Sequence, residues 1–282
     1  MKKAIFTLAI GDNPMYRAAI ASFKAYGKRI GADVIISDQL HYKIQVSNPK
    51  FDSSPAWSEK LYIAEILKEY DRVLYLDADI IVTPWARDIF ELYSDLDTVY
   101  MFNEGRHRDR SEQAVQINNI LGEVDWPKED DRIVYYNSGM FLLSKETGLF
   151  DKANIEEMQA ICNNVKFYDQ TYINYLIRRD NIKSIGVEAN FNRMQLLGHD
   201  DYQKADFIHY SGRGYRQDIP MRELKYIIDF CDMFNDTLTN EQILEYKKQA
   251  WNWYILKQHR KTKLPVALLS AIFGLFRGKY KY

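Results

Sequence analysis

The sequence predicts an α/β domain with a mostly parallel central sheet flanked by helices. An apolar run at 4–10, a helical pattern at 14–27 and a second apolar run at 34–36 indicate a strand, a helix and a strand. Further along the chain, short apolar runs continue to alternate with helical patterns. Parallel strands need a crossover connection, which a helix usually supplies, so this alternation favours a parallel sheet.

Local signals place the individual elements. Asp12 or Asn13 is expected to cap the first helix, Pro14 to lie in its first turn and Gly27 to end it. Further helices are expected at 57–70, 151–164 and 169–178, further strands at 73–76, 99–102, 134–144, 182–185 and 207–209, and loops at 39–55 and 103–111, the second of them flexible. From about Leu224 onward only helices are expected, so the chain is predicted to consist of a catalytic domain at 1–222 and a helical C-terminal region at 223–282.

The composition excludes several classes of protein. The chain has 282 residues, a net charge of −1 and 46% apolar residues, which argues against a disordered chain and against a nucleic-acid-binding protein. Cys162 and Cys231 lack metal-type spacing and are expected to be reduced, buried thiols of a cytoplasmic protein. No apolar stretch reaches the roughly 20 residues that a membrane-spanning helix needs.

Two carboxylates directly follow a predicted strand. Asp77 and Asp79 come after the apolar run 73–76, and in an extended chain side chains two residues apart point the same way. Open α/β sheets bind ligands at the carboxyl ends of their strands, and paired carboxylates suit a hard divalent cation such as Mg²⁺ or Mn²⁺. The pair therefore predicts a metal site, the alternative being a turn that happens to contain two aspartates.

Four further motifs accompany this pair. They are Lys60 upstream, the segment Asn137-Ser138-Gly139, the dipeptide Asp169-Gln170, and His209 followed three residues later by Gly212. With these motifs, residues 4–212 resemble glycosyltransferase family 8, which includes glycogenin and bacterial lipopolysaccharide galactosyl- and glucosyltransferases. The resemblance implies a GT-A-type nucleotide-sugar-binding fold, here with a helical C-terminal extension. It also implies transfer of a hexose, glucose or galactose, from a UDP-sugar donor to a hydroxyl of a glycan or glycolipid acceptor, with retention of anomeric configuration.

The resemblance assigns roles to individual residues. Asp77, Asp79 and His209 would coordinate Mn²⁺, with Mg²⁺ as the alternative, and Asp169 and Gln170 would be catalytic residues at the reactive face of the sugar. The residues expected to bind the donor are Thr7, Ala9, Asp12, Tyr16, Lys60, Asp77, Asn137, Gly139, Gly212, Arg213 and Arg216. Local patterns alone would make Tyr16 a core residue, Lys60 a solvated helix lysine, Asn137–Gly139 a strand bulge and Asp169 a helix cap.

One position departs from the family pattern. The family usually has a lysine on the diphosphate shortly after the glycine that corresponds to Gly212, and Tyr215 falls where that lysine would be. Arg213 or Arg216 is expected to make this contact instead, because a guanidinium group forks onto phosphate oxygens. Because of this departure, an alternative is that the chain is an inactive paralogue that binds a nucleotide-sugar without transferring the sugar.

A second alternative is a phosphohydrolase of the haloacid dehalogenase type. In such an enzyme Asp77 would be the phosphorylated nucleophile, and Asp200-Asp201 would be the later acidic pair that binds Mg²⁺. This interpretation leaves the remaining glycosyltransferase motifs unexplained.

The C-terminal tail has a distinct pattern. The apolar run 264–276 has 13 residues, too few to span a membrane, and basic residues flank it on both sides, among them Lys261, Lys263 and Arg277. This pattern predicts a helix that lies on an anionic membrane surface. The protein would then act at the inner face of the membrane, in the synthesis of lipopolysaccharide or another cell-surface polysaccharide. The alternatives are a helix docked on the core and an oligomer contact.

Overall fold

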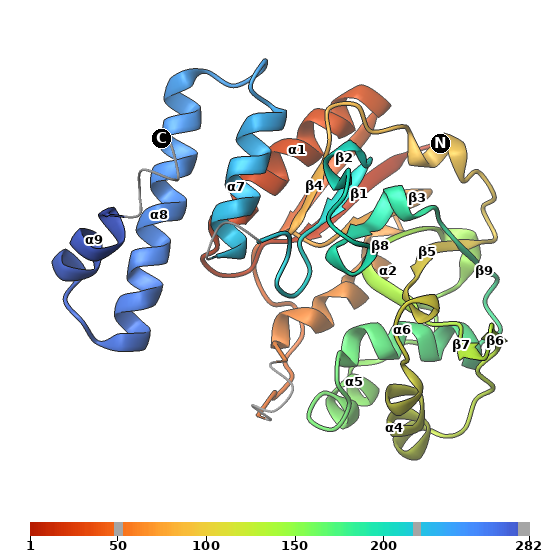
Figure 1. Cartoon of the computed structure of the whole chain (residues 1–282). Coiled ribbons are helices and arrows are strands. Elements are labelled where there is room, and N and C mark those ends of the chain that lie inside the picture. Colours follow the sequence, from red (N-terminus) through yellow and green to blue (C-terminus); the bar gives the residue numbers. More distant parts are fainter. Residues whose placement is uncertain (48–52, 217–220, 276–282) are drawn as a thin grey trace.

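A mostly parallel sheet of six strands forms the centre of the molecule (Figure 1). The computed structural model describes residues 1–47, 53–216 and 221–275. The strand order is β2 (Ala32–Ser37), β1 (Lys3–Leu8), β3 (Arg72–Leu76), β8 (Tyr136–Ser144), β5 (Val99–Asn103) and β9 (Ser184–Gly186). Only β8 runs against the other five strands of this sheet. The predicted fold class is therefore confirmed.

Two smaller sheets complete the strand structure. β10 (Arg193–Met194), β11 (Phe207–His209) and β4 (Ile80–Val82) form one of them, with β11 antiparallel to β4. β6 (Lys128–Glu129) and β7 (Arg132–Ile133) form a short hairpin. The pairing of β4 with β11 joins segments that lie far apart in the sequence, and it builds one wall of the site described below.

Helices cover both faces of the main sheet (Figure 1). On one face lie α1 (Pro14–Ile30) and α7 (Arg222–Met233), with α8 (Asn240–Thr262) and α9 (Val266–Gly274) beyond them. On the other face lie η2 (Pro55–Tyr62), α2 (Ile63–Ile66), α4 (Ser111–Leu121), α5 (Ile155–Ile161) and α6 (Tyr168–Arg179). Short connecting helices are α3 (Ile89–Leu92), η3 (Glu104–Arg106), η4 (Lys145–Thr147), η5 (Ala189–Asn192), η6 (Gln195–Leu197) and η7 (Tyr202–Lys204).

The strands divide their side chains between two cores. Successive residues of a strand point to opposite faces of the sheet. β3 therefore contributes Leu74 and Leu76 to the core under α1 and α7, and Val73 and Tyr75 to the core under α5 and α6. This arrangement explains why the strands are almost continuously apolar rather than alternating.

The first helix is longer than the sequence indicates. Asn13 caps it, but Gly27 lies inside it, and the helix ends at Gly31, whose φ of 68° suits glycine. Gly27 is needed for packing instead: a Cβ atom there would lie 2.7 Å from the carbonyl oxygen of Ala32 at the start of β2. The prediction that Gly27 ends the helix is therefore wrong. Glycine is favoured both at a helix end and where a helix packs closely against a strand, and the local sequence does not distinguish the two.

Two other predicted elements differ from the structure. The helix expected at 57–70 is mostly the 3₁₀ helix η2, followed by the single turn α2. The segment expected to be a flexible loop at 103–111 contains η3 and the start of α4, and it carries a buried ion pair between Glu104 and Arg110. Residues 106–109 between the two partners are exposed, so the buried residues of the segment lie near its ends.

The C-terminal helices pack against the rest of the molecule. The hydroxyl group of Tyr226 on α7 donates to the carbonyl oxygen of Ile80, so α7 shares the core of the main sheet. α8 begins with a capping box between Thr239 and Gln242. It contacts the N-terminal segment through Trp253, whose indole N–H donates to the carbonyl oxygen of Asp12 at 2.9 Å. The predicted boundary after residue 222 stays a prediction.

Candidate active site

The sheet topology gathers polar residues at one edge. β3 and β5 run in the same direction, so the residues that follow them, Asp77 and Glu104, lie at the same edge. β8 runs in the opposite direction, so its first residues lie there too. The register of β8 against β5 jumps between Met101 and Phe102, which leaves a bulge around Gly139. The bulge therefore falls in the segment Asn137–Gly139, for which the sequence analysis gave two interpretations, a strand bulge and a donor-binding segment.

Asp77 and Asp79 lie in a turn. The backbone N–H of Ile80 donates to the carbonyl oxygen of Asp77 at 3.0 Å, so the expectation that the two aspartates alternate along an extended chain is wrong. The pairing of β11 with β4 then places His209 opposite Ile80. In addition, the backbone N–H of Tyr210 donates to the carbonyl oxygen of Asp79 at 2.9 Å. The tertiary pairing of these strands brings the histidine to the aspartates.

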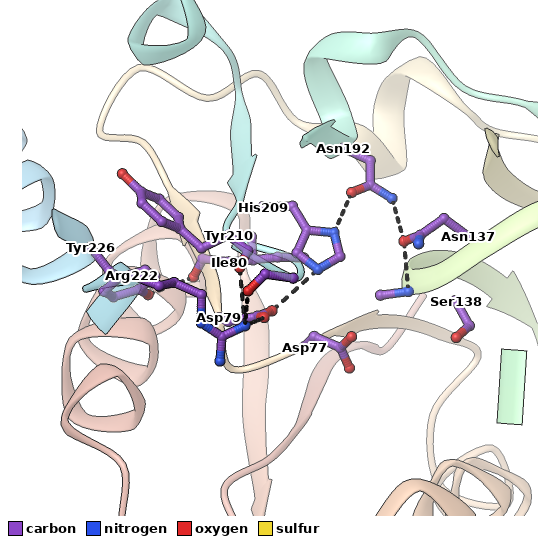
Figure 2. A network of polar contacts seen from close by, with 12 residues as sticks. Asp77, Asp79, Ile80, Asn137, Ser138, Asn192, His209, Tyr210, Arg222 and Tyr226 are labelled. Atoms are coloured by element: carbon purple, nitrogen blue, oxygen red, sulfur yellow. Dashed lines mark hydrogen bonds and ion pairs between the residues drawn. The ribbon is translucent and has the colours of Figure 1, made fainter. Parts of the chain in front are cut away.

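Asp77, Asp79 and His209 form a cluster with the chemistry of a divalent-metal site (Figure 2). Each offers one ligand atom, and these atoms all lie within 4.8 Å of one another. Nε2 of His209 lies 3.2 Å from Oδ1 of Asp79, and that oxygen is buried without a hydrogen-bond partner. Carboxylates and imidazole both bind divalent cations, so these residues fit a divalent-metal site.

The two aspartates of the cluster have different surroundings, and their pKa values shift in opposite directions. Burial acts against the charge of Asp79, but His209 and Arg222 outweigh it and lower the pKa of Asp79 to about 2. Burial raises the pKa of Asp77, with Lys60 acting against the rise and Asp79 adding to it. Asp79 therefore stays ionised, which is the form in which a carboxylate binds a metal.

A buried asparagine orients the histidine. Oδ1 of Asn192 lies 2.7 Å from Nδ1 of His209, and Nδ2 of Asn192 donates to Oδ1 of Asn137 at 3.0 Å (Figure 2). Asn192 is completely buried. Partners of this kind fix the ring and the tautomer of a metal-binding histidine. The sequence contains no local signal for this role of Asn192.

Gly139 is required by the approach of the surrounding groups. A Cβ atom at this position would lie 2.3 Å from Cε1 of His209 and 2.9 Å from Oδ2 of Asp77. Its backbone carbonyl oxygen also accepts the N–H of Asp77 at 2.7 Å. The absence of a side chain therefore lets β8 lie directly against the metal-type cluster.

Lys60 is a buried cation that joins three of the predicted motifs. Its ammonium group donates to Oδ2 of Asp169 at 2.7 Å and to the hydroxyl group of Ser138 at 2.9 Å, and it lies 3.5 Å from Oδ1 of Asp77. Burial works to lower the pKa of Lys60, but Asp169 and Asp77 together raise it. Lys60 is thus not a solvated helix lysine, and the carboxylate of Asp169 is bound to it and to Ser138 rather than capping α6.

The amide group of Gln170 is held in one orientation. Its Oε1 accepts from Nδ2 of Asn137 at 3.0 Å and from the backbone N–H of Ser138 at 3.2 Å. Its Nε2 donates to Oε2 of Glu104 at 3.2 Å, and Glu104 in turn pairs with Arg110. Glu104 follows a strand at the same edge as Asp77, so strand-end placement is a signal that could have identified it from the sequence.

These residues line one cavity of about 1130 Å³. The predicted site residues that line it are Tyr16, Lys60, Asp77, Asp79, Asn137, Gly139, Asp169, Gln170, His209, Gly212, Arg213 and Arg216. Tyr254, Lys257, Gln258 and Lys261 of α8 line the same cavity. The C-terminal region therefore contributes to its wall.

Three predicted nucleotide-binding residues do not line the cavity. Thr7 is completely buried, and its hydroxyl oxygen has no hydrogen-bond partner within the described part of the chain. The backbone N–H of Ala9 donates to the carbonyl oxygen of Ser37 at 2.8 Å, and Asp12 is exposed. Tyr16, in contrast, lies in the cavity wall: burial, followed by the charges of Asp79 and Asp77, raises the pKa of its hydroxyl group.

The residues that follow Gly212 include the arginines that were expected to contact the diphosphate. Tyr215 is buried and stacks on Tyr202 with ring centroids 3.9 Å apart, so it has a packing role. Arg213 and Arg216 are exposed at the cavity rim. Arg222, which the sequence analysis did not single out, contacts Oδ2 of Asp79 at 3.3 Å.

The fold is that of the GT-A glycosyltransferases, as comparison with solved structures shows. The structure of galactosyltransferase LgtC in complex with donor and acceptor sugar analogs is similar over 84% of this chain and 98% of its own, with a TM-score of 0.53 and 16% identity. A glycosyltransferase involved in the glycosylation of the major capsid of PBCV-1 is similar over 81% of this chain and 100% of its own, with a TM-score of 0.52 and 15% identity.

The particular family follows from the sequence profile. The profile of glycosyl transferase family 8 matches residues 7–214, so the chain belongs to that family. A search of curated proteins found no match. Family membership confirms the predicted resemblance and makes the chain a glycosyltransferase rather than a phosphohydrolase. Asp200 and Asp201 line a separate pocket with Arg193 and Lys204.

Proposed function

We propose that this chain transfers glucose or galactose from a UDP-sugar to a hydroxyl group of a glycan acceptor, with retention and with Mn²⁺ as the preferred cation and Mg²⁺ as the alternative. The observation that carries the proposal is the cluster of Asp77, Asp79 and His209 in the wall of the main cavity. Oδ1 of Asp79 is buried beside the ring of His209 and has no hydrogen-bond partner, which suits a ligand to a cation. A bound cation would neutralise the charge that develops on the departing diphosphate.

The residues beside this cluster would bind the sugar. Asn137, Asp169 and Gln170 belong to one hydrogen-bonded network with Lys60 and Ser138, so their polar groups are preorganised. Preorganised polar groups stabilise developing charge without reorganisation during the reaction. Asp169 and Gln170 would thus stabilise the cationic character of the sugar at its anomeric carbon.

The proposed reaction exchanges one bond at that carbon for another. The bond from the anomeric carbon to the phosphate oxygen breaks, and a bond to the acceptor oxygen forms on the same face. The proton of the acceptor hydroxyl passes to the departing phosphate oxygen. A double displacement through the carboxylate of Asp169 is the alternative, although its Oδ2 already accepts hydrogen bonds from Lys60 and Ser138.

The nucleotide and the acceptor would both bind in the main cavity. Tyr16 lies in the cavity wall, which supports the proposal that it stacks on uracil. The backbone of Thr7 and Ala9 and the side chain of Asp12 remain the other proposed contacts to the base. Lys257 and Lys261 of α8 line the cavity as well, which favours an acceptor with polar or anionic groups.

The C-terminal helix would bring the enzyme to a glycolipid acceptor. α9 is docked by Leu269, which is buried, and by Phe273, whose ring lies 5.0 Å from that of Tyr254. The exposed apolar residues of α9 and of the positions next to its ends are Leu264, Val266, Leu268, Ile272 and Leu275. Among the described residues no helix is long and apolar enough to cross a membrane. We therefore propose a peripheral contact with an anionic membrane surface, consistent with lipopolysaccharide or other surface-polysaccharide synthesis. The predicted basic flank Arg277, Lys279 and Lys281 lies outside the described residues.

Release of UDP tests the proposal. The protein is incubated with a panel of UDP-sugars without acceptor, first with Mn²⁺ and then with excess EDTA. We expect metal-dependent release from one hexose donor, lost in Asp79→Asn and kept in Asp201→Asn, whose carboxylate lies in a separate pocket. Binding of UDP without release from any donor would instead indicate the inactive paralogue.

The role of Asp169 needs a separate variant. Asp169→Asn keeps the shape of the side chain but removes its nucleophilic charge. Near-normal turnover of this variant would exclude a covalent intermediate on Asp169, and the anomeric configuration of the product, followed by NMR, would test retention directly.

A further inference from the structure

Building on the proposed function, we infer that Arg222 is the protein cation that binds the diphosphate of the donor, in place of Arg213 or Arg216. Arg222 is the first residue of α7 and lies beyond the part of the chain that the family profile matches. The inference goes beyond the proposed function because it assigns a specific phosphate contact to a residue that no motif identifies.

The side chain of Arg222 is held at the metal-type cluster (Figure 2). Nη1 lies 3.3 Å from Oδ2 of Asp79 and also donates to the carbonyl oxygens of Tyr210, at 3.2 Å, and Gly212, at 3.4 Å. The turn that follows β11 packs against its stem, because a Cβ atom at Gly214 would lie 3.0 Å from Cγ of Arg222. The guanidinium group is therefore positioned by tertiary contacts.

Part of the guanidinium group remains available. All three of these contacts involve Nη1, and Nε lies 3.8 Å from Oε1 of Glu223, whereas within the described residues Nη2 makes no hydrogen bond. The side chain is 25% exposed and lines the main cavity. A guanidinium group with free donors facing a cavity is suited to bind phosphate oxygens.

The charge balance of Asp79 supports the same role. Its two oxygens face different side chains: Oδ1 faces Nε2 of His209 and Oδ2 faces Nη1 of Arg222. A divalent cation held by Asp77, Asp79 and His209 would offset the negative charge of Asp79 and weaken its attraction for Arg222. The remaining carboxylate near Arg222 is that of Glu223, whose Oε1 lies 3.8 Å from Nε. A diphosphate beside the cluster would be attracted to both positive charges.

The other candidates are less well placed. Tyr215 is buried and its hydroxyl group donates to the carbonyl oxygen of Arg193 at 2.7 Å. Arg213 and Arg216 line the cavity from exposed positions, and neither forms a described ion pair with Asp77 or Asp79. Of these residues, Arg222 is the one in direct contact with a carboxylate of the cluster.

Binding of UDP and of uridine separates the phosphate contact from the base contact. Isothermal titration with Mn²⁺ gives the ratio of the two affinities for the full chain and for Arg222→Gln. We expect Arg222→Gln to lower the affinity for UDP about 10- to 100-fold and to leave uridine binding unchanged, as expected for loss of a charge-assisted hydrogen bond. Arg222→Lys should recover part of the loss, since lysine keeps the positive charge but lacks the paired N–H donors of the guanidinium group.

Control variants make the outcome specific. Arg260→Gln is the matched control, because Arg260 is exposed on α8 and does not line the cavity. Circular dichroism and the melting temperature check that each variant is folded. An unchanged ratio of UDP to uridine affinity in Arg222→Gln, or a larger loss in Arg213→Gln or Arg216→Gln, would overturn the inference. Failure of the unmodified chain to bind UDP at all would contradict the proposed function instead.

Discussion

Nε2 of His209 faces Oδ1 of Asp79 at 3.2 Å, and the surrounding hydrogen bonds determine the tautomer of the imidazole ring. Oδ1 of Asn137 accepts the backbone N–H of Gly139, so the group of Asn192 that contacts it must be the amide NH₂. Oδ1 of Asn192 therefore faces Nδ1 of His209, and this nitrogen must be the donor. In a neutral His209, Nε2 is then a lone pair directed at a carboxylate. A cation between the two removes the repulsion, which is the physical case for a metal at this position.

Removing the orienting asparagine should weaken metal binding. Asn192→Ala leaves the three ligands in place but frees the ring of His209 to rotate and change tautomer. Loss of such a partner typically lowers metal affinity about 10- to 100-fold. Titration of Mn²⁺ by calorimetry measures the change, with Asn190→Ala as the control because Asn190 is exposed on the same short helix. Equal Mn²⁺ affinities for the two variants would contradict the assigned network.

A methyl group at Gly139 should disrupt the cluster. Gly139→Ala places a Cβ atom 2.3 Å from Cε1 of His209, a contact that requires the histidine or β8 to move. We expect loss of the Mn²⁺-dependent rise in melting temperature, together with a lower melting temperature without metal. Gly186→Ala on β9 is the control, because the nearest atom to its Cβ would be 3.8 Å away. A normal Mn²⁺ response in Gly139→Ala would show that the cluster does not bind the ion.

The ion pair between Glu104 and Arg110 should contribute to stability as well as to the site. Both side chains are less than a tenth exposed, so Glu104→Ala leaves a buried guanidinium group without its counter-charge. Removing one partner of a buried pair costs about 3–5 kcal/mol of the free energy of unfolding. Urea denaturation measures this loss.

Two further variants isolate the reason for that loss. Adding Arg110→Met to Glu104→Ala should recover part of the stability, because it removes the uncompensated charge. Glu112→Ala, at an exposed position of α4, should change the free energy of unfolding little. A double variant less stable than Glu104→Ala would show that the uncompensated charge is not the cause.

The exposed face of α9 should bind anionic vesicles. Leu268 is 45% exposed on α9 and Leu256 is 43% exposed on α8, so the two form a matched pair. Leu268→Glu should reduce cosedimentation with phosphatidylglycerol vesicles, since it places a negative charge on the apolar face, whereas Leu256→Glu should not. Truncation after Lys263 should have the larger effect, with UDP release retained. Undiminished sedimentation of the truncated protein would leave the membrane proposal without support.

The thiol of Cys231 should be unreactive in the folded protein. Burial raises the pKa of Cys231 to about 12, so almost no thiolate is present at pH 8, and the side chain is 1% exposed. Reaction with a thiol reagent is expected only after unfolding, because the thiolate is the reactive form. Rapid labelling of Cys231 in the native protein at pH 8, identified by mass spectrometry, would contradict this.

Local patterns in the sequence predicted the order of the elements. The apolar runs that became β1, β3, β5 and β8 were recognisable because buried strands are short, apolar and bounded by turn residues. Boundaries and helix type were less predictable. Gly27 was predicted to end a helix, and the segment at 57–70 was predicted to be an α-helix. Packing against β2 and against the site decided their conformations instead, and the local sequence contains no signal for that packing.

The sequence by itself determined the fold class, the family and most residues of the candidate site, because these depend on residue types at characteristic spacings. Only the tertiary structure decided how the residues act together. The pairing of β4 with β11 places His209 beside Asp79, and the meeting of α7 with that turn places Arg222 on the same carboxylate. Neither contact has a local signature, because the partners lie more than a hundred residues apart and meet only when the core closes.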